Sequence, residues 1–208
     1  MVKLPDPPEA DALADLEMVE LPQGGLWWRV YPAGGTHPGA WDGFRDFGPT
    51  SARFDHQEPP AHVDGRRLVA YEGALGALCL AERFEEHRRI LRRAGGPRLC
   101  AFRLAAPLEV VDLRDLWPTR AGASQALSSG SRPRSRAWAR AIYGASGGTA
   151  AGLSCRSSMY GGETAVVLWE AARAALPGVP TIDLALSDPR LTGVLLRAAT
   201  SIGYHLAA

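Results

Sequence analysis

Lysine is almost absent from this chain of 208 residues: Lys3 is the only one, and arginine supplies nearly all of the positive charge. This scarcity excludes Schiff-base catalysis and the lysine-containing phosphate loop of nucleotide hydrolases. An excess of charge of one sign is also missing, since the formal net charge is +1. The whole-chain charge therefore gives no sign of a dedicated nucleic-acid or membrane-surface binder.

Cysteine and histidine are few, and their spacing excludes the common metal sites. The three cysteines, Cys79, Cys100 and Cys155, form no CxxC motif. Their apolar surroundings favour buried, reduced thiols in a reducing compartment. The five histidines form no HExxH motif and no other paired-ligand spacing. We therefore expect no metal cofactor.

Long apolar runs are missing as well. A helix that crosses a bilayer needs about 20 apolar residues, and the apolar runs of this sequence are much shorter. The chain starts with MVKLPDPPEADALADLEMVEL, which is acidic and rich in proline and lacks the basic and apolar regions of a signal peptide. We expect a cytoplasmic protein without membrane contact, in which residues 1–22 form a loose N-terminal arm with a short helix around 10–16.

The rest of the sequence alternates irregularly between strand and helix patterns. Strands are predicted for the ranges 25–31, 67–71, 98–104, 108–113, 149–158, 164–169 and 181–186. Helices are predicted for 74–93, 120–127, 133–143 and 188–204. Residues 32–66, rich in Gly, Pro, Asp and His, predict a long loop that is functional or mobile. Because no GxGxxG motif follows the first strand, the pattern indicates a mixed α+β fold and not a doubly wound dinucleotide-binding fold.

Glu82 interrupts an apolar stripe in the predicted helix 74–93. Leu75, Leu78 and Cys79 occupy positions i, i+3 and i+4, so position i+7 should be apolar as well. Two interpretations remain open. The helix leaves the core at this point and Glu82 is its first solvated residue, or a carboxylate stands at the mouth of an apolar pocket, where it stabilises positive charge that develops in a reaction.

Other candidates also have an ordinary and a functional interpretation. Arg53 is either a surface arginine or a planar fork for a phosphate group. Tyr71 ends a buried strand as a core residue or as part of a site, and Ser157 is a turn serine or a ligand-binding hydroxyl. The basic stretch SRPRSRAWAR, residues 131–140, is a solvated helix face with balanced charge or a contact for nucleic acid.

The order of five segments carries more information than any one of them. The segments are WWRVY (27–31), GPTSARF (48–54), RLVAY (67–71), YEGALGALCLAE (71–82) and GLSCRSSMYGGETAVVLW (152–169). Tyr71 and Glu82 are eleven positions apart. This order and spacing resemble the RES domain family, named for its arginine, glutamate and serine, which is the toxin half of bacterial toxin–antitoxin systems.

The resemblance implies a fold and an activity. The fold is α+β, similar to ADP-ribosyltransferase toxins, with a split mixed β-sheet, flanking helices and NAD+ in the cleft; residues 23–208 then form a single catalytic domain. The activity is degradation of NAD+ by cleavage of the nicotinamide–ribose bond, with water or phosphate as acceptor. Mono-ADP-ribosylation of a protein and a non-catalytic interaction module are the alternatives. The implied partner is an Xre-type antitoxin that blocks the active site, with nucleic acid reached only through the antitoxin; a homodimer is also compatible with the resemblance.

Carried over position by position, the resemblance also implies a set of site residues. Glu82, Arg53 and Tyr71 are the catalytic candidates, and Arg29, Arg53, Tyr71 and Ser157 are the candidates for binding NAD+. In this sequence Phe54 stands where the family usually has tryptophan, and the stretch between Arg53 and Tyr71 is longer than in other members. The serine lies in an Arg-Ser-Ser sequence, so the role falls on Ser157 or on its neighbour.

Overall fold

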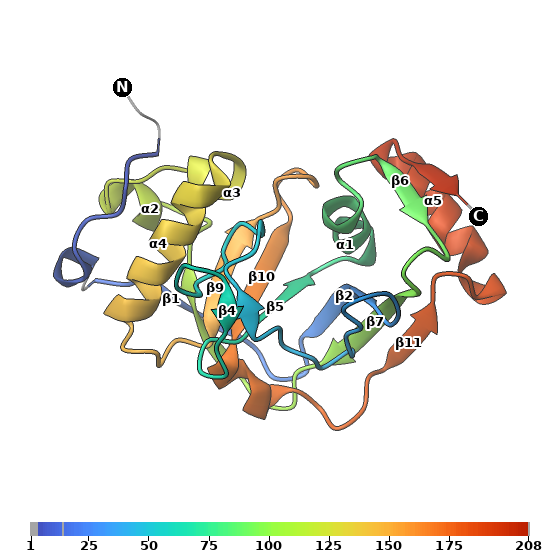
Figure 1. Cartoon of the computed structure of the whole chain (residues 1–208), viewed down its shortest axis with the longest axis horizontal. Helices are drawn as coiled ribbons and strands as arrows, with labels where there is room; N and C mark the ends of the chain where they lie inside the picture. Colours follow the sequence, from blue (N-terminus) through green and yellow to red (C-terminus); the bar gives the residue numbers. More distant parts are fainter. Residues whose placement is uncertain (1–3, 14, 208) are drawn as a thin grey trace.

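The centre of the fold is an eight-stranded mixed β-sheet with the strand order β1-β8-β9-β10-β5-β2-β7-β11 (Figure 1). The structure, a computed structural model, describes residues 4–13 and 15–207. In sheet order the strands are Met18–Leu21, Leu108–Asp112, Gly152–Arg156, Thr164–Trp169, Val69–Gly73, Leu26–Pro32, Pro97–Arg103 and Ile182–Ala185. Strands β8 and β9 are parallel, whereas the other neighbours are antiparallel. Each predicted strand range overlaps one of these strands.

The sheet is split between β5 and β2. Strand β10 pairs with β5 from Trp169↔Val69 to Ala165↔Gly73, but β5 and β2 share only the pair Trp28↔Gly73. The sheet therefore consists of a half with β1, β8, β9, β10 and β5 and a half with β2, β7 and β11. The α+β class with a split mixed sheet, predicted from the sequence, is confirmed.

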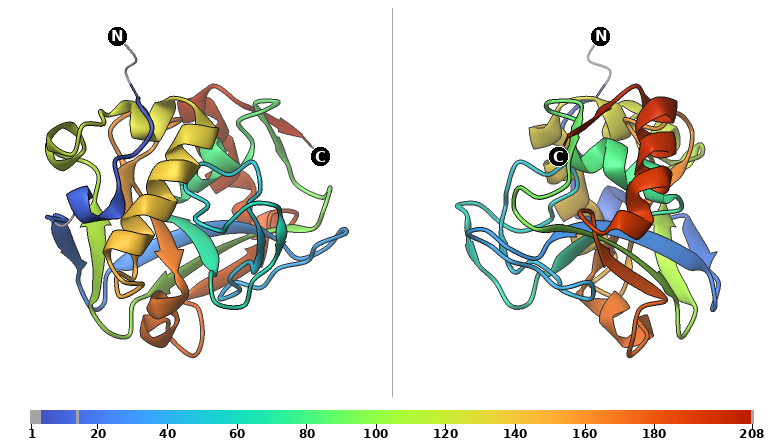
Figure 2. Two further views of the ribbon diagram at one scale, coloured as in Figure 1. Left: turned by 60° about the vertical axis from the view of Figure 1, so that its left-hand side comes forward. Right: turned by 90° about the vertical axis from the view of Figure 1, so that its right-hand side faces the viewer.

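Helices flank each half of the sheet. They are α1 (Gly76–Arg83), α2 (Trp117–Arg120), α3 (Ala126–Ser129), α4 (Arg132–Ala145) and α5 (Thr192–Ile202), together with the 3-10 helices η1 (Ala10–Leu13), η2 (Glu170–Ala175) and η3 (Pro189–Leu191). Helices α2, α3 and α4 lie beside the β9–β10 half, and α1 and α5 lie beside the β2–β7–β11 half (Figure 1). Seen from that end, α5 is the foremost helix (Figure 2, right).

The buried apolar side chains form three clusters, which lie on different faces and at different ends of the sheet. Trp138 and Ile142 of α4 pack with Val69 and Val167 on one face of the first half. A second cluster lies on the opposite face and spans both halves of the sheet; it includes Ala70, Val166, Trp27 and Phe102. The switch from Val69 to Ala70 follows the alternation of side chains along a strand. The third cluster lies between α1, α5 and the β7 side of the sheet.

The predicted helix 74–93 is wrong in its extent. Helix α1 ends at Arg83, and residues Arg89–Leu91 form strand β6, which pairs in parallel with β12 (His205–Ala207). The left-handed backbone of Arg88, with a φ of 49°, prevents a continuous helix. Tertiary pairing with the last strand therefore outweighs the helical pattern of the local sequence.

The segment expected to be a loose arm packs against the rest of the chain. Strand β1 pairs with β8, and Leu13 of η1 is 2% exposed. The indole Nε1 of Trp138 donates to the carbonyl oxygen of Pro5 at 2.9 Å, and Nε1 of Trp117 donates to that of Asp15 at 2.7 Å. Two buried tryptophans thus obtain their hydrogen-bond acceptors from this segment. Residues 1–3 and 14 lie outside the described residues.

Within the described residues, no helix has the length and apolarity that crossing a membrane requires. The three cysteines are buried and unpaired, as expected. No group of three or more His, Cys, Asp or Glu side chains in the described part of the chain is placed to hold a metal ion.

Candidate active site

A pocket of about 600 Å³ lies at the split of the sheet and is lined by all five of the predicted site residues. These residues are Arg29, Arg53, Tyr71, Glu82 and Ser157. They come from β2, the loop before β5, β5 itself, α1 and the turn after β9, so the fold brings together segments that are far apart in the sequence. The volume is in the range typical of sites for small organic ligands.

Glu82 lies in the last turn of α1, at the edge of the pocket. Leu78 and Cys79 are 2% and 7% exposed, whereas Glu82 is half-buried, so the apolar stripe ends where the pocket begins. The thiol of Cys79 donates to the carbonyl oxygen of Trp28 at 3.1 Å and holds the helix on β2. Gly73 allows this close packing, because a Cβ there would lie 2.7 Å from Cδ2 of Leu78.

One oxygen of the Glu82 carboxylate is fixed by the turn after β9. The Ser157 hydroxyl donates to Oε1 at 2.5 Å, and the backbone N–H groups of Ser158 and Met159 donate to the same atom at 3.0 and 3.3 Å. Around Oε2, the contact within the described residues is the Ser158 hydroxyl at 3.5 Å. The carboxylate is therefore held through Oε1, while Oε2 is left for a ligand in the pocket.

The structure separates the roles of the two neighbouring serines. Ser157 is buried, and its hydroxyl oxygen accepts from the backbone N–H of Tyr160 at 2.9 Å while it donates to Glu82. Ser158 is exposed, and its hydroxyl lies 3.4 Å from Oε1 of Glu82, a weak contact. Ser157 is therefore the side chain that orients the glutamate, and Ser158 contributes through its backbone.

Two arginines place positive charge in the pocket. Nη1 of Arg53 donates to the carbonyl oxygen of Gly130 at 2.6 Å. Burial lowers the pKa of Arg53, and the nearby charge of Arg132 lowers it further, against the opposing effect of Glu82 and Glu85. Positive charge is thus concentrated beside the carboxylate of Glu82. This arrangement attracts an anionic group to that part of the pocket.

Arg29 lies on the other half of the sheet. Its Nη1 donates to the carbonyl oxygen of Trp41 at 3.2 Å and to Oε1 of Glu72 at 3.4 Å. The described residues use only this one nitrogen of the guanidinium group, which leaves Nε and Nη2 for a ligand.

Tyr71 faces the pocket from the middle of a buried sheet. The side chain is 36% exposed, although protein surrounds it closely, because its open side is the pocket. Burial raises the pKa of Tyr71 above its usual range; the charge of Asp55 adds to this effect and Arg45 opposes it. The phenol of Tyr71 therefore stays neutral. Its hydroxyl can donate a hydrogen bond, and its ring presents an aromatic surface to the pocket.

The loop 32–66 is partly folded and positions Arg53. It contains the short strands β3 (Phe47–Gly48) and β4 (His62–Val63), which pair with each other. The carboxylate of Asp55, fully buried, accepts from Nη2 of Arg45 and from the backbone N–H of Thr50, each at 2.7 Å. These contacts fix the turn that leads into Arg53.

Sequence reasoning missed Glu72, which also lines the pocket. This residue is 4% exposed, and its Oε2 has no hydrogen-bond partner among the described residues. Burial raises the pKa of Glu72 to about 8, with the charge of Arg29 opposing the shift. The signal in the sequence was an acid directly after Tyr71, in a strand whose other residues are uncharged.

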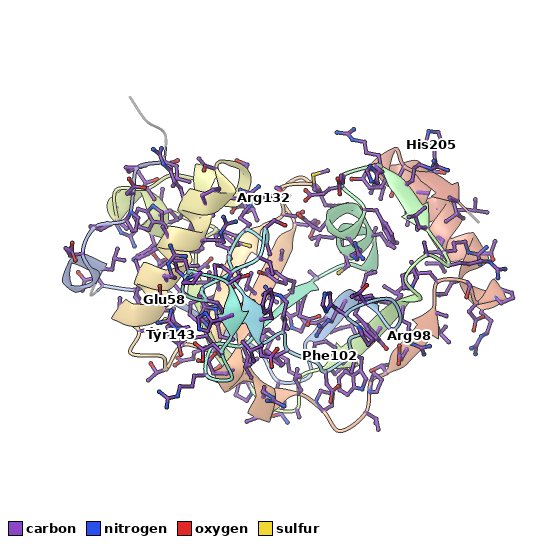
Figure 3. All side chains as sticks on the ribbon, viewed as in Figure 1. Glu58, Arg98, Phe102, Arg132, Tyr143 and His205 are labelled. Atoms are coloured by element: carbon purple, nitrogen blue, oxygen red, sulfur yellow. The ribbon has the colours of Figure 1, made fainter. Side chains whose placement is uncertain are left out.

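The basic stretch 131–140 forms much of α4, and three of its arginines contact acidic side chains. Arg132 pairs with Glu85, Arg134 lies 3.7 Å from Asp6 and Arg140 lies 3.5 Å from Glu58. Figure 3 labels Arg132 at one end of α4 and Glu58 beside the same helix. These contacts favour the interpretation of a solvated helix face with balanced charge over a nucleic-acid contact.

Comparison with known proteins shows a likeness of fold. A chain in the crystal structure of the M. tuberculosis MbcT–MbcA toxin–antitoxin complex matches with a TM-score of 0.57 and 13% sequence identity. The match covers 92% of this chain and 96% of that chain. No family model matches the sequence, and no curated protein matches it either. At this identity the comparison establishes the fold alone, and the predicted ADP-ribosyltransferase-like architecture is confirmed.

Proposed function

We propose that the chain is an enzyme that degrades NAD+ by breaking the bond between nicotinamide and ribose, and that it is the toxin of a toxin–antitoxin pair. The observation that carries the proposal is the carboxylate of Glu82, which Ser157 holds at 2.5 Å at the edge of a pocket that also contains Arg29, Arg53 and Tyr71. The shared fold with a chain of a toxin–antitoxin complex supports the toxin role.

The geometry of Glu82 suits the chemistry of this bond. Cleavage passes through a ribose with oxocarbenium character, as in glycoside hydrolysis. Nicotinamide leaves as a neutral molecule and needs little help from an acid. The main requirement is therefore a fixed negative group beside the ribose, and Oε2 of Glu82 supplies it while Oε1 is held by the turn after β9. A group held in place before the reaction avoids the cost of reorientation in the transition state.

The remaining pocket residues suit the rest of the substrate. Arg53 and Arg29 bind the pyrophosphate, because a guanidinium group matches two phosphate oxygens at once. Tyr71 packs against the nicotinamide ring, which carries positive charge before the bond breaks. NAD+ is the substrate in this proposal, and water or inorganic phosphate accepts the ribose.

The implied partner is an Xre-type antitoxin that covers the mouth of the pocket. The fold neighbour was crystallised as a toxin–antitoxin complex, which supports a protein partner. We assign the activity to the cytoplasm, since three buried, unpaired thiols are typical of a reducing compartment.

The test is the consumption of NAD+ by the purified protein, with products identified by NMR. Glu82→Gln keeps the size of the side chain and removes its charge, so we expect nicotinamide release to fall by about 100- to 1,000-fold. The matched control is Glu109→Gln, at an exposed glutamate of β8 outside the pocket, which should retain full activity.

The products identify the acceptor, and one result would refute the proposal. Free ADP-ribose as the product identifies water as the acceptor. ADP-ribose phosphate that forms only with added phosphate identifies phosphate as the acceptor. With NAD+ labelled in its ADP-ribose part, transfer of the label to protein identifies ADP-ribosylation. Full nicotinamide release by folded Glu82→Gln protein would exclude the mechanism. No release from folded wild-type protein, with or without phosphate and a cell extract as protein acceptor, would exclude the activity.

A further inference from the structure

Glu72 and Arg29 meet across the split of the sheet. Glu72 belongs to β5 and Arg29 to β2, and the two strands share only the pair Trp28↔Gly73 next to this contact. Oε1 of Glu72 lies 3.4 Å from Nη1 of Arg29. The Glu72 side chain is 2% exposed, whereas that of Arg29 is 13% exposed. Both side chains line the pocket, and Arg29 is the more exposed of the two, so it is the more accessible to a ligand.

Arg29 is the charged partner of Glu72 among the described groups that surround it. Cys79 of α1 and Cys100 of β7 face the acid, but burial raises the pKa of Cys100 to about 12 and that of Cys79 well above its usual range, so both thiols stay neutral. Val166 of β10, apolar, is the register partner of Glu72. The ionised form of Glu72 thus depends on a single positive charge.

We propose that binding of a phosphate group at Arg29 and binding of a proton at Glu72 are coupled, so that an anionic ligand occupies the site together with a neutral Glu72. This inference deepens the proposed function and rests on it, because the pyrophosphate of NAD+ is the expected ligand of Arg29. Glu72 does not touch the ligand in this arrangement and is a positioning residue.

The coupling follows from charge balance. A phosphate at Arg29 neutralises the one cation that lies near Glu72 among the described residues, and it adds negative charge close to the acid. Both effects destabilise the buried carboxylate, which then takes a proton from solvent on its unpartnered oxygen, Oε2. By reciprocity, protonation of Glu72 frees the charge of Arg29 and strengthens binding of the phosphate. Since the pKa of Glu72 without ligand is about 8, uptake is expected above that pH and not at pH 6, where the acid is already neutral.

Calorimetry tests the coupling without turnover. ADP-ribose and inorganic pyrophosphate are titrated into the protein at pH 6 and pH 8.5, each in two buffers of different ionisation enthalpy. For ADP-ribose, whose phosphate groups do not titrate in this range, we expect uptake of about 0.5 to 1 proton per bound ligand at pH 8.5 and close to none at pH 6. Pyrophosphate exchanges protons of its own in this range, so its uptake is counted as the difference from Glu72→Gln. The dissociation constant of ADP-ribose should be level below pH 7 and rise by up to tenfold per pH unit above pH 8.

Variants assign the proton to Glu72. Glu72→Gln should bind ADP-ribose with no proton uptake and with an affinity that does not change with pH, whereas the exposed control Glu109→Gln should behave like wild type. Binding to wild-type protein without proton uptake at pH 8.5 would overturn the inference even if Glu72→Gln fails to fold, and so would unchanged uptake in folded Glu72→Gln.

The outcomes separate this inference from the proposed function. Proton-coupled binding of pyrophosphate without any degradation of NAD+ would retain the coupled site and remove the enzyme activity. NAD+ degradation combined with binding that is not coupled to proton uptake would retain the enzyme activity and remove the coupled site. Failure of both probes to bind would exclude the phosphate site at Arg29.

Discussion

Replacing Ser157 with alanine removes the hydroxyl that donates to Oε1 of Glu82 at 2.5 Å, while the backbone donors of Ser158 and Met159 remain. A hydrogen bond to a charged group contributes about 1.5 to 3 kcal/mol. If that contribution orients the carboxylate for the reaction, its loss lowers kcat by about 10- to 150-fold, since 1.4 kcal/mol corresponds to a factor of ten. KM should change little, because the arginines proposed to bind the pyrophosphate are untouched.

The assay is the rate of nicotinamide release at saturating NAD+, with two matched variants. Ser158→Ala removes only hydroxyl contacts of 3.4 and 3.5 Å and keeps the backbone donor, so we expect less than about a threefold loss of kcat. Ser157→Thr keeps the hydroxyl and should recover most of the activity. An equal or larger loss in Ser158→Ala, or no recovery in folded Ser157→Thr, would refute the assignment of the orienting role to Ser157.

Two further predictions concern stability. Because burial raises the pKa of Glu72 from 4.5 to about 8, its contribution to stability is complete below pH 4.5 and is lost as the pH rises from there through 8, since unfolding releases the proton in this range and a higher pH favours the release. The loss is at most about 5 kcal/mol at 1.36 kcal/mol per pH unit. Urea denaturation should thus show Glu72→Gln gaining on wild type between pH 5 and pH 8.5, and parallel curves would contradict this. Asp55→Asn leaves the guanidinium of Arg45 without its charged partner, and we expect a loss of about 3 kcal/mol in thermal unfolding; a change below about 0.5 kcal/mol would show that the loop does not depend on this pair.

Local patterns in the sequence predicted much of the fold, whereas the set of five site residues followed from the order of segments that resembles the RES domain family. Alternation of side chains located β2 and β5, because Trp27 and Tyr31 do share a buried face. Helical spacing located the face of α1 that packs on the core, and with it the position of Glu82. These features depend on residues close together in the sequence, so they can be predicted without a structure.

The features that the sequence did not predict depend on distant partners. Glu72 looked like an ordinary acid because its partner, Arg29, lies on another strand. Helix α1 ends early because β6 pairs with a strand at the far end of the chain. The segment 1–22 looked like an arm because the indole groups that donate to its carbonyl oxygens, those of Pro5 and Asp15, belong to α4 and α2. The choice between Ser157 and Ser158 needed the direction of one hydroxyl, which spacing alone does not give.

The single register pair at the split has a consequence for how precisely the site is built. Arg29 belongs to one half of the sheet and Tyr71 and Ser157 to the other, while α1, which carries Glu82, packs at the junction. The distance between Arg29, proposed to bind phosphate, and Glu82, proposed to face the ribose, thus depends on how the two halves pack at this junction. Gly73 belongs to this junction, because an added methyl group there would collide with Leu78 of α1, so a residue that touches no ligand helps to set the dimensions of the pocket.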